Sequence, residues 1–331
     1  MKKWLWLGVA AVCTPAIAYA HEVYVLTPEK VESAISTPSF SGLEVAFSNA
    51  DQFMFWAFIG LFVVLTVFFV SLWHWFEDHT APLFAKIRPY APAVARITLG
   101  ISLLSAAYYN ALFGPELSLP EVFGTWTLFI RITLAVMGLM LLLNFYTWVA
   151  AAGMLVLFGI EVLTHQWYML TYVNYFGLAI ALILFSGVAL SNYFKQYSML
   201  ILRVCFGVGL IYSSFYAKIL HNNLALQIAE LPLAGHSYGV AHYLGFEPHF
   251  LVLGAAIIEL IIGIFFIIGM EIRWTALFML FWLTLSFLYF GETVWPHFVL
   301  IGIGITLFCH GYDRYSVEWS LLKRFGRKPV A

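Results

Sequence analysis

Nine runs of about 20 apolar residues constrain this sequence more than any other feature. They lie near 53–73, 92–112, 126–144, 147–164, 172–190, 198–219, 250–269, 274–290 and 297–311. A helix of about 20 residues crosses the hydrocarbon core of a bilayer, where every backbone hydrogen bond has to be satisfied internally. Only 10% of the 331 residues are charged, against about 25% in soluble domains. The sequence therefore predicts an all-α, polytopic transmembrane helical bundle with nine spans, and the lipid bilayer is its first partner.

The first 20 residues predict a cleaved signal peptide. Lys2 and Lys3 precede a short apolar core, and Ala18-Tyr19-Ala20 fits the small-x-small cleavage rule. An uncleaved anchor helix is the alternative, because the apolar run is close to the lower length limit for a span. If cleavage follows Ala20, the mature chain begins with His21, whose α-amine and imidazole together can chelate a metal.

The distribution of basic residues predicts an orientation. With the segment after residue 20 placed outside, 13 of the 16 Lys and Arg residues fall on the inner side, and only Lys30, Arg131 and Lys218 fall on the outer side. Cytoplasmic loops carry an excess of Lys and Arg. We therefore expect a multi-pass protein of the bacterial cytoplasmic (inner) membrane, with an extracytoplasmic N-terminus and a cytoplasmic C-terminus. The net charge of −1 gives no reason to expect nucleic acid as a partner.

Two stretches resemble each other and predict an internal repeat. "ARITLGISLLSAAYYNAL" begins at Ala95 and "LRVCFGVGLIYSSFYAKIL" begins at Leu202, and each has an Arg followed four residues later by a Gly. Four helices return the chain to its starting side, so the two units run in the same direction. We expect one leading helix and two parallel-repeated four-helix units. The predicted boundaries are 1–20 for the signal peptide, 21–90 for the N-terminal segment and first helix, 91–194 for the first unit, 195–314 for the second, and 315–331 for a basic tail that lies against anionic headgroups.

Three stretches of the second unit point to a known family. They are "ILRVCFGVGLIYSSFYAKI" (201–219), "LVLGAAIIELIIGIFFIIGMEIRWTAL" (251–277) and "FGETVWPHFVLIGIGITLFCHGYDRYS" (290–316). They contain an Arg-Gly helix with a Lys near its end, a Glu-bearing helix that ends in Gly and a basic turn, and a Trp-Pro-His helix. In these features residues 195–316 resemble the DoxX-like membrane proteins, which include the DoxD-type large subunit of thiosulfate:quinone oxidoreductase.

The resemblance implies a redox-associated membrane subunit, although the family also covers membrane redox-stress complexes and many members of unknown role. Residues 91–190 match more weakly. Apolar or neutral residues near Ala111 and Thr133 occupy the positions of Lys218 and Glu259. We therefore expect the first unit to be a structural half and the second to carry the site.

Lys218 and Glu259 are the ionisable residues of the second unit that matter most, because charges within a span are costly and indicate function. If their helices are neighbours, Lys218 can snorkel and pair with Glu259. Such a pair either fixes helix register or serves as a proton or quinone-carbonyl partner in a cleft. Residues 221–249 form the longest later connection, in which a short helix from Leu224 to Leu231 is expected. This loop is either a cap or a spacer.

Seven of the ten histidines fall on the predicted outer side: His21, His165, His221, His236, His242, His249 and His297. Glu161 and His165 share a helix face at i and i+4, and Glu292 and His297 flank "TVWP". A rim of Glu161, His165, His221, Glu292 and His297 is geometrically possible. Imidazole and carboxylate suit copper, zinc or iron, and also proton transfer at a quinol hydroxyl. The spacing matches no specific metal motif, so ordinary interfacial histidines are the alternative.

Three functional classes remain open. In the first, a quinone-linked oxidoreductase subunit, Glu259, Lys218, His297 and Glu292 are catalytic, and Arg131, Trp295 and Tyr216 contact quinone or a small sulfur reductant. In the second, a copper-handling protein, His21, His165, His221 and Glu161 bind the metal. The third is a non-catalytic scaffold. No flavin, haem or iron–sulfur motif is visible, so in the first class electrons pass directly to quinone or through a partner subunit.

Overall fold

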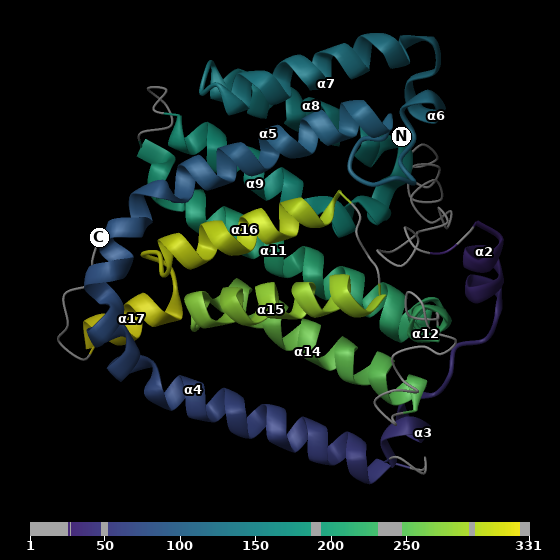
Figure 1. Ribbon diagram of the computed structural model, residues 1–331, viewed down its shortest axis with the longest axis vertical. Coiled ribbons are helices and arrows are strands. Elements are labelled where there is room, and N and C mark those ends of the chain that lie inside the picture. The colour runs from purple at the N-terminus through teal and green to yellow at the C-terminus, as the bar shows by residue number, and fades with distance from the viewer. Residues whose placement is uncertain are drawn as a thin grey trace, which may run out of the picture.

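The computed structural model describes residues 26, 28–47, 52–186, 193–230, 247–290 and 295–324. The longer helices are α4 (Gln52–Ile87), α5 (Ala91–Tyr109), α7 (Thr127–Leu142), α8 (Thr147–His165), α9 (Val173–Phe185), α11 (Ser198–Ser214), α14 (Pro248–Ile268), α15 (Ile272–Phe290) and α16 (His297–His310). The short helices at the ends of the bundle are α2 (Pro28–Ser36), α3 (Gly42–Phe47), α6 (Leu119–Phe123), α12 (Asn222–Ala229) and α17 (Val317–Arg324). In Figure 1, α2, α3, α6 and α12 lie at one end and α17 at the other. We call these the α12 end and the α17 end.

The all-helical fold class is confirmed for the described residues, in which no strand occurs. Each of the nine predicted segments coincides with a helix. Within the part of the chain that the structure describes, six helical stretches are long and apolar enough to cross a membrane: Gln52–Leu72, Pro82–Tyr109, Leu119–Leu142, Thr147–Phe185, Lys195–Leu220 and Pro248–Ile268. Two shorter apolar helices, Ile272–Thr284 and His297–His310, accompany them. The stretch Thr147–Phe185 holds both α8 and α9, which pack against each other, so the chain reverses direction within it.

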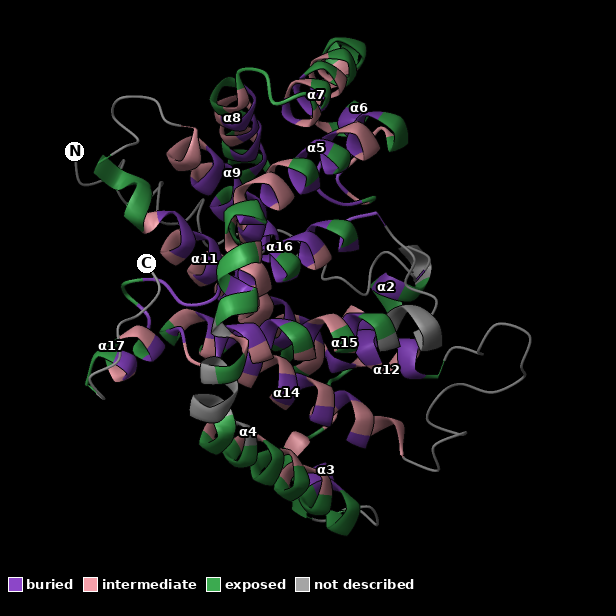
Figure 2. Cartoon of the chain, turned by 60° about the vertical axis from the view of Figure 1, so that its left-hand side comes forward, coloured by how far each residue is buried: buried purple, intermediate pink, exposed green. Residues whose placement is uncertain are grey.

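Helix α4 illustrates why the chain needs a bilayer. Only 6% of its apolar window is buried inside the protein, and large side chains such as Phe53 and Val64 are exposed. Figure 2 shows α4 at the edge of the bundle with most of its surface exposed. A patch of this size would be unfavourable in water, where the largest apolar patches of soluble monomers cover about 300–600 Å². The observed surface therefore fits a helix that faces lipid.

Pairs of glycines let the helices approach closely at two crossings. An added Cβ on Gly207 of α11 would lie 2.5 Å from the carbonyl oxygen of Gly263 in α14. An added Cβ on Gly138 of α7 would lie 2.9 Å from the carbonyl oxygen of Gly100 in α5. Because lipid tails are as apolar as leucine side chains, membrane helices associate through such close packing at small residues. The α5–α7 and α11–α14 contacts are thus of the same kind.

An arginine next to each crossing satisfies carbonyl groups at a helix end. Arg96 of α5 donates to the carbonyls of Leu141 and Leu142, the latter at 2.9 Å. Arg203 of α11 donates to the carbonyls of Phe266 at 2.8 Å and Ile267 at 2.5 Å. The last carbonyls of a helix have no intrahelical partner, so both arginines replace hydrogen bonds that water would otherwise supply.

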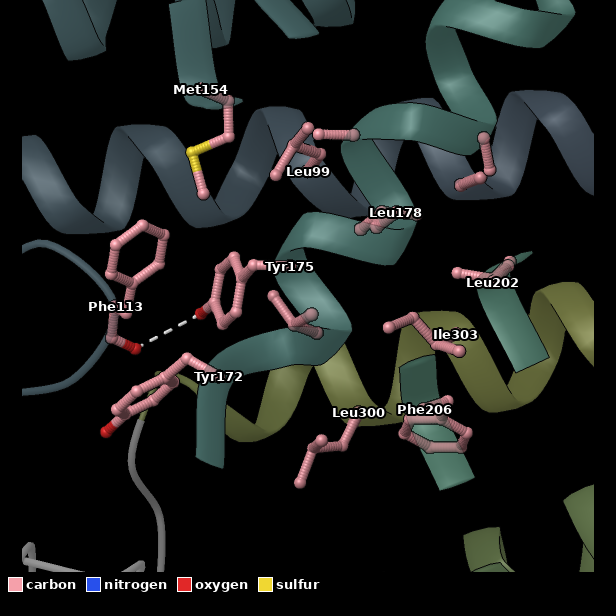
Figure 3. Close-up of a cluster of buried hydrophobic side chains, with 14 of the residues drawn as sticks. Leu99, Phe113, Met154, Tyr172, Tyr175, Leu178, Leu202, Phe206, Leu300 and Ile303 are labelled. Carbon is pink, nitrogen blue, oxygen red and sulfur yellow. Dashed lines mark hydrogen bonds between the residues drawn. The ribbon is translucent and has the colours of Figure 1, made fainter. Parts of the chain in front are cut away.

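The centre of the bundle is formed by α5, α9, α11 and α16. Each of these helices contributes a fully buried residue to the core: Leu99, Leu178, Leu202 and Ile303. Figure 3 shows them together with the aromatic residues Phe113, Tyr172, Tyr175 and Phe206. Helix α9 packs along α11, and α5 packs along α16, so the two halves of the chain share one core.

Candidate functional site

The ion pair expected within the second half of the chain forms. Lys218 Nζ lies 3.0 Å from Glu259 Oε2, and the two side chains are 14% and 18% exposed. Trp282 of α15 adds its indole Nε1, which donates to Glu259 Oε1 at 3.4 Å. An ionised carboxylate only accepts hydrogen bonds. The Glu259 carboxylate therefore interacts with one cationic donor, Lys218, and one neutral donor, Trp282. We call Lys218, Glu259 and Trp282 the Lys218 site.

Local backbone structure explains how Lys218 reaches Glu259. Helix α11 continues into a π-helix, η6 (Phe215–Leu220), which contains Lys218 and Tyr216. A π-helix changes the angular position of the residues that follow it, and such segments occur frequently at functional sites. Helix α14 carries Glu259 on the face that packs against α11 and η6. The site therefore depends on an irregular turn that periodicity in the sequence does not reveal.

Aromatic residues extend the Lys218 site toward the α12 end. Tyr216 stacks with Tyr212, with ring centroids 6.3 Å apart, and its other neighbour is the His221 ring at 4.7 Å. Burial lowers the pKa of His221, so its imidazole is neutral at pH 7 and keeps one nitrogen as an acceptor. Tyr216, which is predicted to contact the ligand, lies in the same π-helix as Lys218 and next to His221.

A segment from the N-terminal part of the chain crosses the α12 end beside these residues. Asn222 exchanges two hydrogen bonds with the backbone of Phe40, at 3.0 and 2.9 Å. Ser39 Oγ donates to the carbonyl of Leu220 at 2.5 Å. Leu26 packs with Leu224 in a small apolar cluster that also contacts Tyr216. A short helix occurs in this connection as predicted, but α12 (Asn222–Ala229) begins two residues earlier and ends at Ala229. The N-terminal segment contacts this helix.

His297 begins α16, and Trp295 lies two residues before it, at the boundary between the two halves of the chain. Both side chains are buried, at 5% and 4% exposure. The Trp295 ring stacks with Tyr109 of α5, with centroids 6.4 Å apart and planes 6° from parallel. Within the described residues the Trp295 indole N–H has no hydrogen-bond partner. A buried donor of this kind is costly, so it is available to a ligand or to water.

Sequence analysis missed a polar cluster in the first half of the chain. The phenol groups of Tyr168 and Tyr172 both donate to Glu116 Oε1, the second at 2.5 Å. Glu116 Oε2 is buried and has no hydrogen-bond partner in the described part of the chain. Glu161 lies near enough to interact electrostatically with Glu116. We call Glu116, Glu161, His165, Tyr168 and Tyr172 the Glu116 cluster.

The loop between α5 and α6 explains the position of Glu116. Asn110 ends α5 in the left-handed region, with φ 60°, and the chain then folds back through the Ala111–Ser118 bridge. This reversal buries the apolar loop residues and turns the Glu116 carboxyl inward. A Cβ on Gly114 would lie 2.1 Å from the Tyr172 hydroxyl oxygen and 2.5 Å from Glu116 Oε2, so only glycine fits. The sequence signal was "FGPELS", a turn with one acid, which by itself is common in solvent-exposed loops.

Burial raises the pKa of Glu116 to about 7, and the hydrogen bond from Tyr168 offsets part of this effect. Desolvation disfavours the charged carboxylate, and the nearby Glu161 adds like-charge repulsion. Glu161 itself is fully buried and lies 2.8 Å from His165 Nδ1. The expected i, i+4 pairing of Glu161 and His165 is confirmed.

The predicted metal ligands are not gathered at one place in the described structure. Glu161 and His165 belong to the Glu116 cluster, whereas His221 lies beside Tyr216. Among the residues described, no three His, Cys, Asp or Glu side chains are grouped so as to hold a metal ion. His21 and Glu292 lie outside the described residues, so their positions stay predictions.

Arg131, which is expected to contact the ligand, lies on α7. It is exposed, and its Nε donates to the carbonyl oxygen of Ala107 at 3.0 Å. The Glu161 carboxylate pairs with His165. Arg131 lies on α7 against the end of α5, where carbonyls lack intrahelical donors, and this explains its choice of partner.

Comparison with known proteins identifies one family. Residues 198–292 match the family described as DoxX. No curated protein and no solved structure matches the chain. The matched segment runs from α11 through α15 and contains Lys218, Glu259 and Trp282, whereas Trp295, His297 and the Glu116 cluster lie outside it. The DoxX-like resemblance expected from the sequence is therefore confirmed over residues 198–292.

Proposed function

We propose that this DoxX-like membrane protein is a redox-associated subunit that binds a quinone head group at the Lys218 site. The depth of the ion pair carries the proposal. Glu259 is the twelfth of the 21 residues of α14, roughly 16 Å along the helix axis from Pro248 at 1.5 Å per residue. That distance is about half of a ~30 Å hydrocarbon core. A charged pair at this depth is costly, and such residues usually serve binding or proton transfer.

The chemistry of the three side chains suits a quinone. The Lys218 ammonium and the Trp282 indole are hydrogen-bond donors for a quinone carbonyl, and the Glu259 carboxylate is a base for a quinol hydroxyl. Reduction of a quinone to a quinol takes two electrons and two protons. Glu259 handles protons, and the electrons come from a small sulfur reductant such as thiosulfate or through a partner subunit. Side-chain exposures of 14% and 18% leave the pair within reach of a ligand.

The remaining predicted contact residues take subsidiary roles in this proposal. Trp295 offers its buried indole N–H to the ligand beside Tyr109, and His297 exchanges protons together with Glu292. Arg131 is suited to an oxyanion because of its planar fork of donors. Its Nη groups take no part in the bond to Ala107, which uses Nε.

We also propose the finer architecture expected from the sequence, namely nine crossings, a leading helix and two parallel four-helix units. The paired features support it. Arg96 and Arg203 each lie four residues before a crossing glycine, and each binds carbonyls three and four residues after the partner glycine. Lys86, Lys195 and Lys323 lie toward the α17 end, which favours a cytoplasmic α17 end in an inner membrane.

Purification in mild detergent from the native membrane tests the redox proposal. Lipid extraction should recover quinone from the wild-type protein, and the protein should reduce added quinone with thiosulfate or sulfide as donor. Glu259→Gln should abolish the reduction, because the amide can neither take up a proton nor pass one to the reduced quinone. Glu247→Gln is the matched control, since Glu247 begins the same helix and pairs with His249 at the α12 end.

The proposal is wrong if wild-type protein holds no quinone and shows no activity with any of these donors. It is also wrong if Glu259→Gln and Glu247→Gln reduce quinone equally well. A protein that shows neither quinone nor metal but co-purifies with another subunit would instead be a scaffold.

One observation favours copper handling as a second candidate. Leu26 packs beside Leu224 and Tyr216, and Tyr216 contacts His221. Five residues span at most about 18 Å, so a mature N-terminal His21 can reach His221. Elemental analysis of the purified protein should then find near-stoichiometric copper, and His21→Ala should lose it. Equal copper in wild-type and variant protein would exclude His21 as a ligand.

A further inference from the structure

We propose that a hollow at the α17 end binds the phosphate group of an anionic phosphate ester. The hollow has a volume of about 450 Å³ and is lined by Arg314, Trp319, Ser320, Lys323 and Arg324. It lies away from the Lys218 site, beyond the end of α16 at His310. Three of its five lining residues are basic.

Nearby acidic residues do not neutralise this charge. Asp313 is 4% exposed, and its Oδ2 lies 2.5 Å from Arg203 Nε inside the bundle. Glu318 is also 4% exposed, and its Oε2 accepts a hydrogen bond from the backbone N–H of Ile272 at 3.3 Å. Among the residues described around the hollow, no carboxylate lines it. The cationic field of Arg314, Lys323 and Arg324 therefore faces a ligand from outside the chain.

Helix α17 holds Lys323 and Arg324 in place, and Arg314 lies shortly before its first residue. Its residue Leu322 is buried at 5% exposure, and Trp319 packs on Tyr312 with ring centroids 5.9 Å apart. The Trp319 N–H donates to Ser316 Oγ at 3.1 Å, which fixes the first turn. Arg314 uses Nη1 for Gln196 Oε1 at 3.3 Å and keeps its other donors. A planar guanidinium and a compact ammonium on a fixed helix suit the three acceptor oxygens of a phosphate.

The surroundings of the hollow indicate headgroup depth. The hollow begins four residues after α16 ends, and Tyr315 stacks with Tyr197, with centroids 5.0 Å apart and planes 15° from parallel. Tyr193 is 75% exposed in the same region of the chain. Tyr and Trp gather where a membrane meets water, because one edge of each ring is polar. A lipid headgroup would reach the hollow from the side, and a soluble phosphate ester would reach it from the aqueous phase.

Native mass spectrometry of the full-length protein in detergent tests the site. Phosphatidylglycerol should be retained in preference to phosphatidylcholine, whose choline carries a positive charge. The double variant Lys323→Gln/Arg324→Gln should bind phosphatidylglycerol roughly 25-fold more weakly, at about fivefold for each basic residue removed near a membrane surface. Lys195→Gln is the control, because Lys195 is an exposed basic residue close to Gln196 that does not line the hollow.

Both variants alter exposed side chains, so thermal unfolding should show that they are folded. Equal retention of phosphatidylglycerol by the double variant and by Lys195→Gln would overturn the proposal, as would equal retention of the two lipids by the wild type. A competition arm with glycerol 3-phosphate identifies the source of the phosphate. Displacement of lipid at comparable concentration assigns a soluble ester, and persistence of the lipid assigns a headgroup.

Discussion

The α5–α7 and α11–α14 crossings are built alike but hold different side chains. Each has a pair of glycines in contact and an arginine that donates to carbonyls of the second helix. Counted from the glycines, the positions of Lys218 and Glu259 correspond to Ala111 and Leu134, which are 3% and 0% exposed. Similar crossings therefore have buried apolar residues at these positions in one place and an ion pair in the other. The first crossing forms without the charges that η6 and α14 carry at the second, so packing at the glycines does not require them.

The first half of the chain places its ionisable groups elsewhere. Glu116, Glu161 and His165 lie where the chain turns at the α12 end, beside Tyr168 and Tyr172. This half thus carries a buried carboxyl group whose pKa burial raises to about 7, and its interpretation as a structural half stays a prediction. One half has its ionisable groups deep in the bundle, and the other has them at the end of the bundle. The two halves therefore differ in chemistry although their helix crossings are similar.

The largest expected effect is a difference in stability between variants of Arg203 and Arg96, the arginines at the two crossings. Arg203→Gln leaves the buried Asp313 without its cation, and removal of one partner of a buried pair costs about 3–5 kcal/mol. Arg96→Gln loses hydrogen bonds to two carbonyls only, and we expect about 1 kcal/mol. Thermal unfolding in detergent should rank the variants in this order. Partial recovery in Arg203→Gln/Asp313→Asn would support the explanation, and equal effects of the two single variants would contradict it.

The second prediction compares the glycine contacts. Gly207→Ala places a Cβ 2.5 Å from a backbone oxygen, and we expect a loss of about 2–3 kcal/mol of stability, as in other overpacked contacts. Gly100→Ala meets its nearest atoms at 3.0–3.1 Å and should lose only about 1 kcal/mol. The matched control is Gly159→Ala, because an added Cβ there meets nothing within 4 Å. A loss for Gly159→Ala as large as for Gly207→Ala would refute the role of close approach.

The third prediction asks whether the second crossing tolerates the apolar character of the first. Lys218→Met should cost about 2 kcal/mol, below the range for a fully buried pair because both side chains are partly exposed. The double variant Lys218→Met/Glu259→Leu should recover to within about 1 kcal/mol of the wild type, since it leaves no unpaired charge. A double-mutant cycle of unfolding free energies measures this coupling. Strictly additive losses would show that the two residues do not act as a pair.

The last prediction concerns pH and the Glu116 cluster, with an effect no larger than that expected for Lys218→Met. The folded-state pKa of Glu116 is raised to about 7 from 4.5, so between these values the folded protein binds more protons than the unfolded chain. Its contribution is fully present below pH 4.5 and is lost as pH rises to 7, by roughly 2 kcal/mol at 1.36 kcal/mol per pKa unit after allowance for its partial exposure. Unfolding measured across this range should lose the slope in Glu116→Gln. An unchanged slope in that variant would assign the pH dependence to other groups.

Much of the architecture could be predicted because a chain in lipid has to satisfy its backbone hydrogen bonds internally, which restricts it to a few structures. The apolar runs, the Arg-Gly spacing and the DoxX-like stretches all depend on residues close together in the sequence. The Lys218–Glu259 pair was also predictable, since two charges in adjacent spans have few other partners. The Glu116 cluster was not, because Glu116 is 45 residues from Glu161 along the chain and its loop resembles an ordinary exposed turn. The hydrogen bond from Arg131 to the Ala107 carbonyl was not predictable either, because a single backbone carbonyl has no signature in the sequence.

The sequence by itself determined that the chain is helical, that it enters a membrane, and which helix carries Glu259. Hydrophobicity and backbone hydrogen bonding act locally, so they can be recognised in short stretches. The tertiary structure decided which helices cross at glycines, that a π-helix turns Lys218 toward Glu259, and that a loop glycine lets Glu116 meet two tyrosines. These features depend on contacts of about 3 Å between distant segments, and such contacts exist only after the helices have packed.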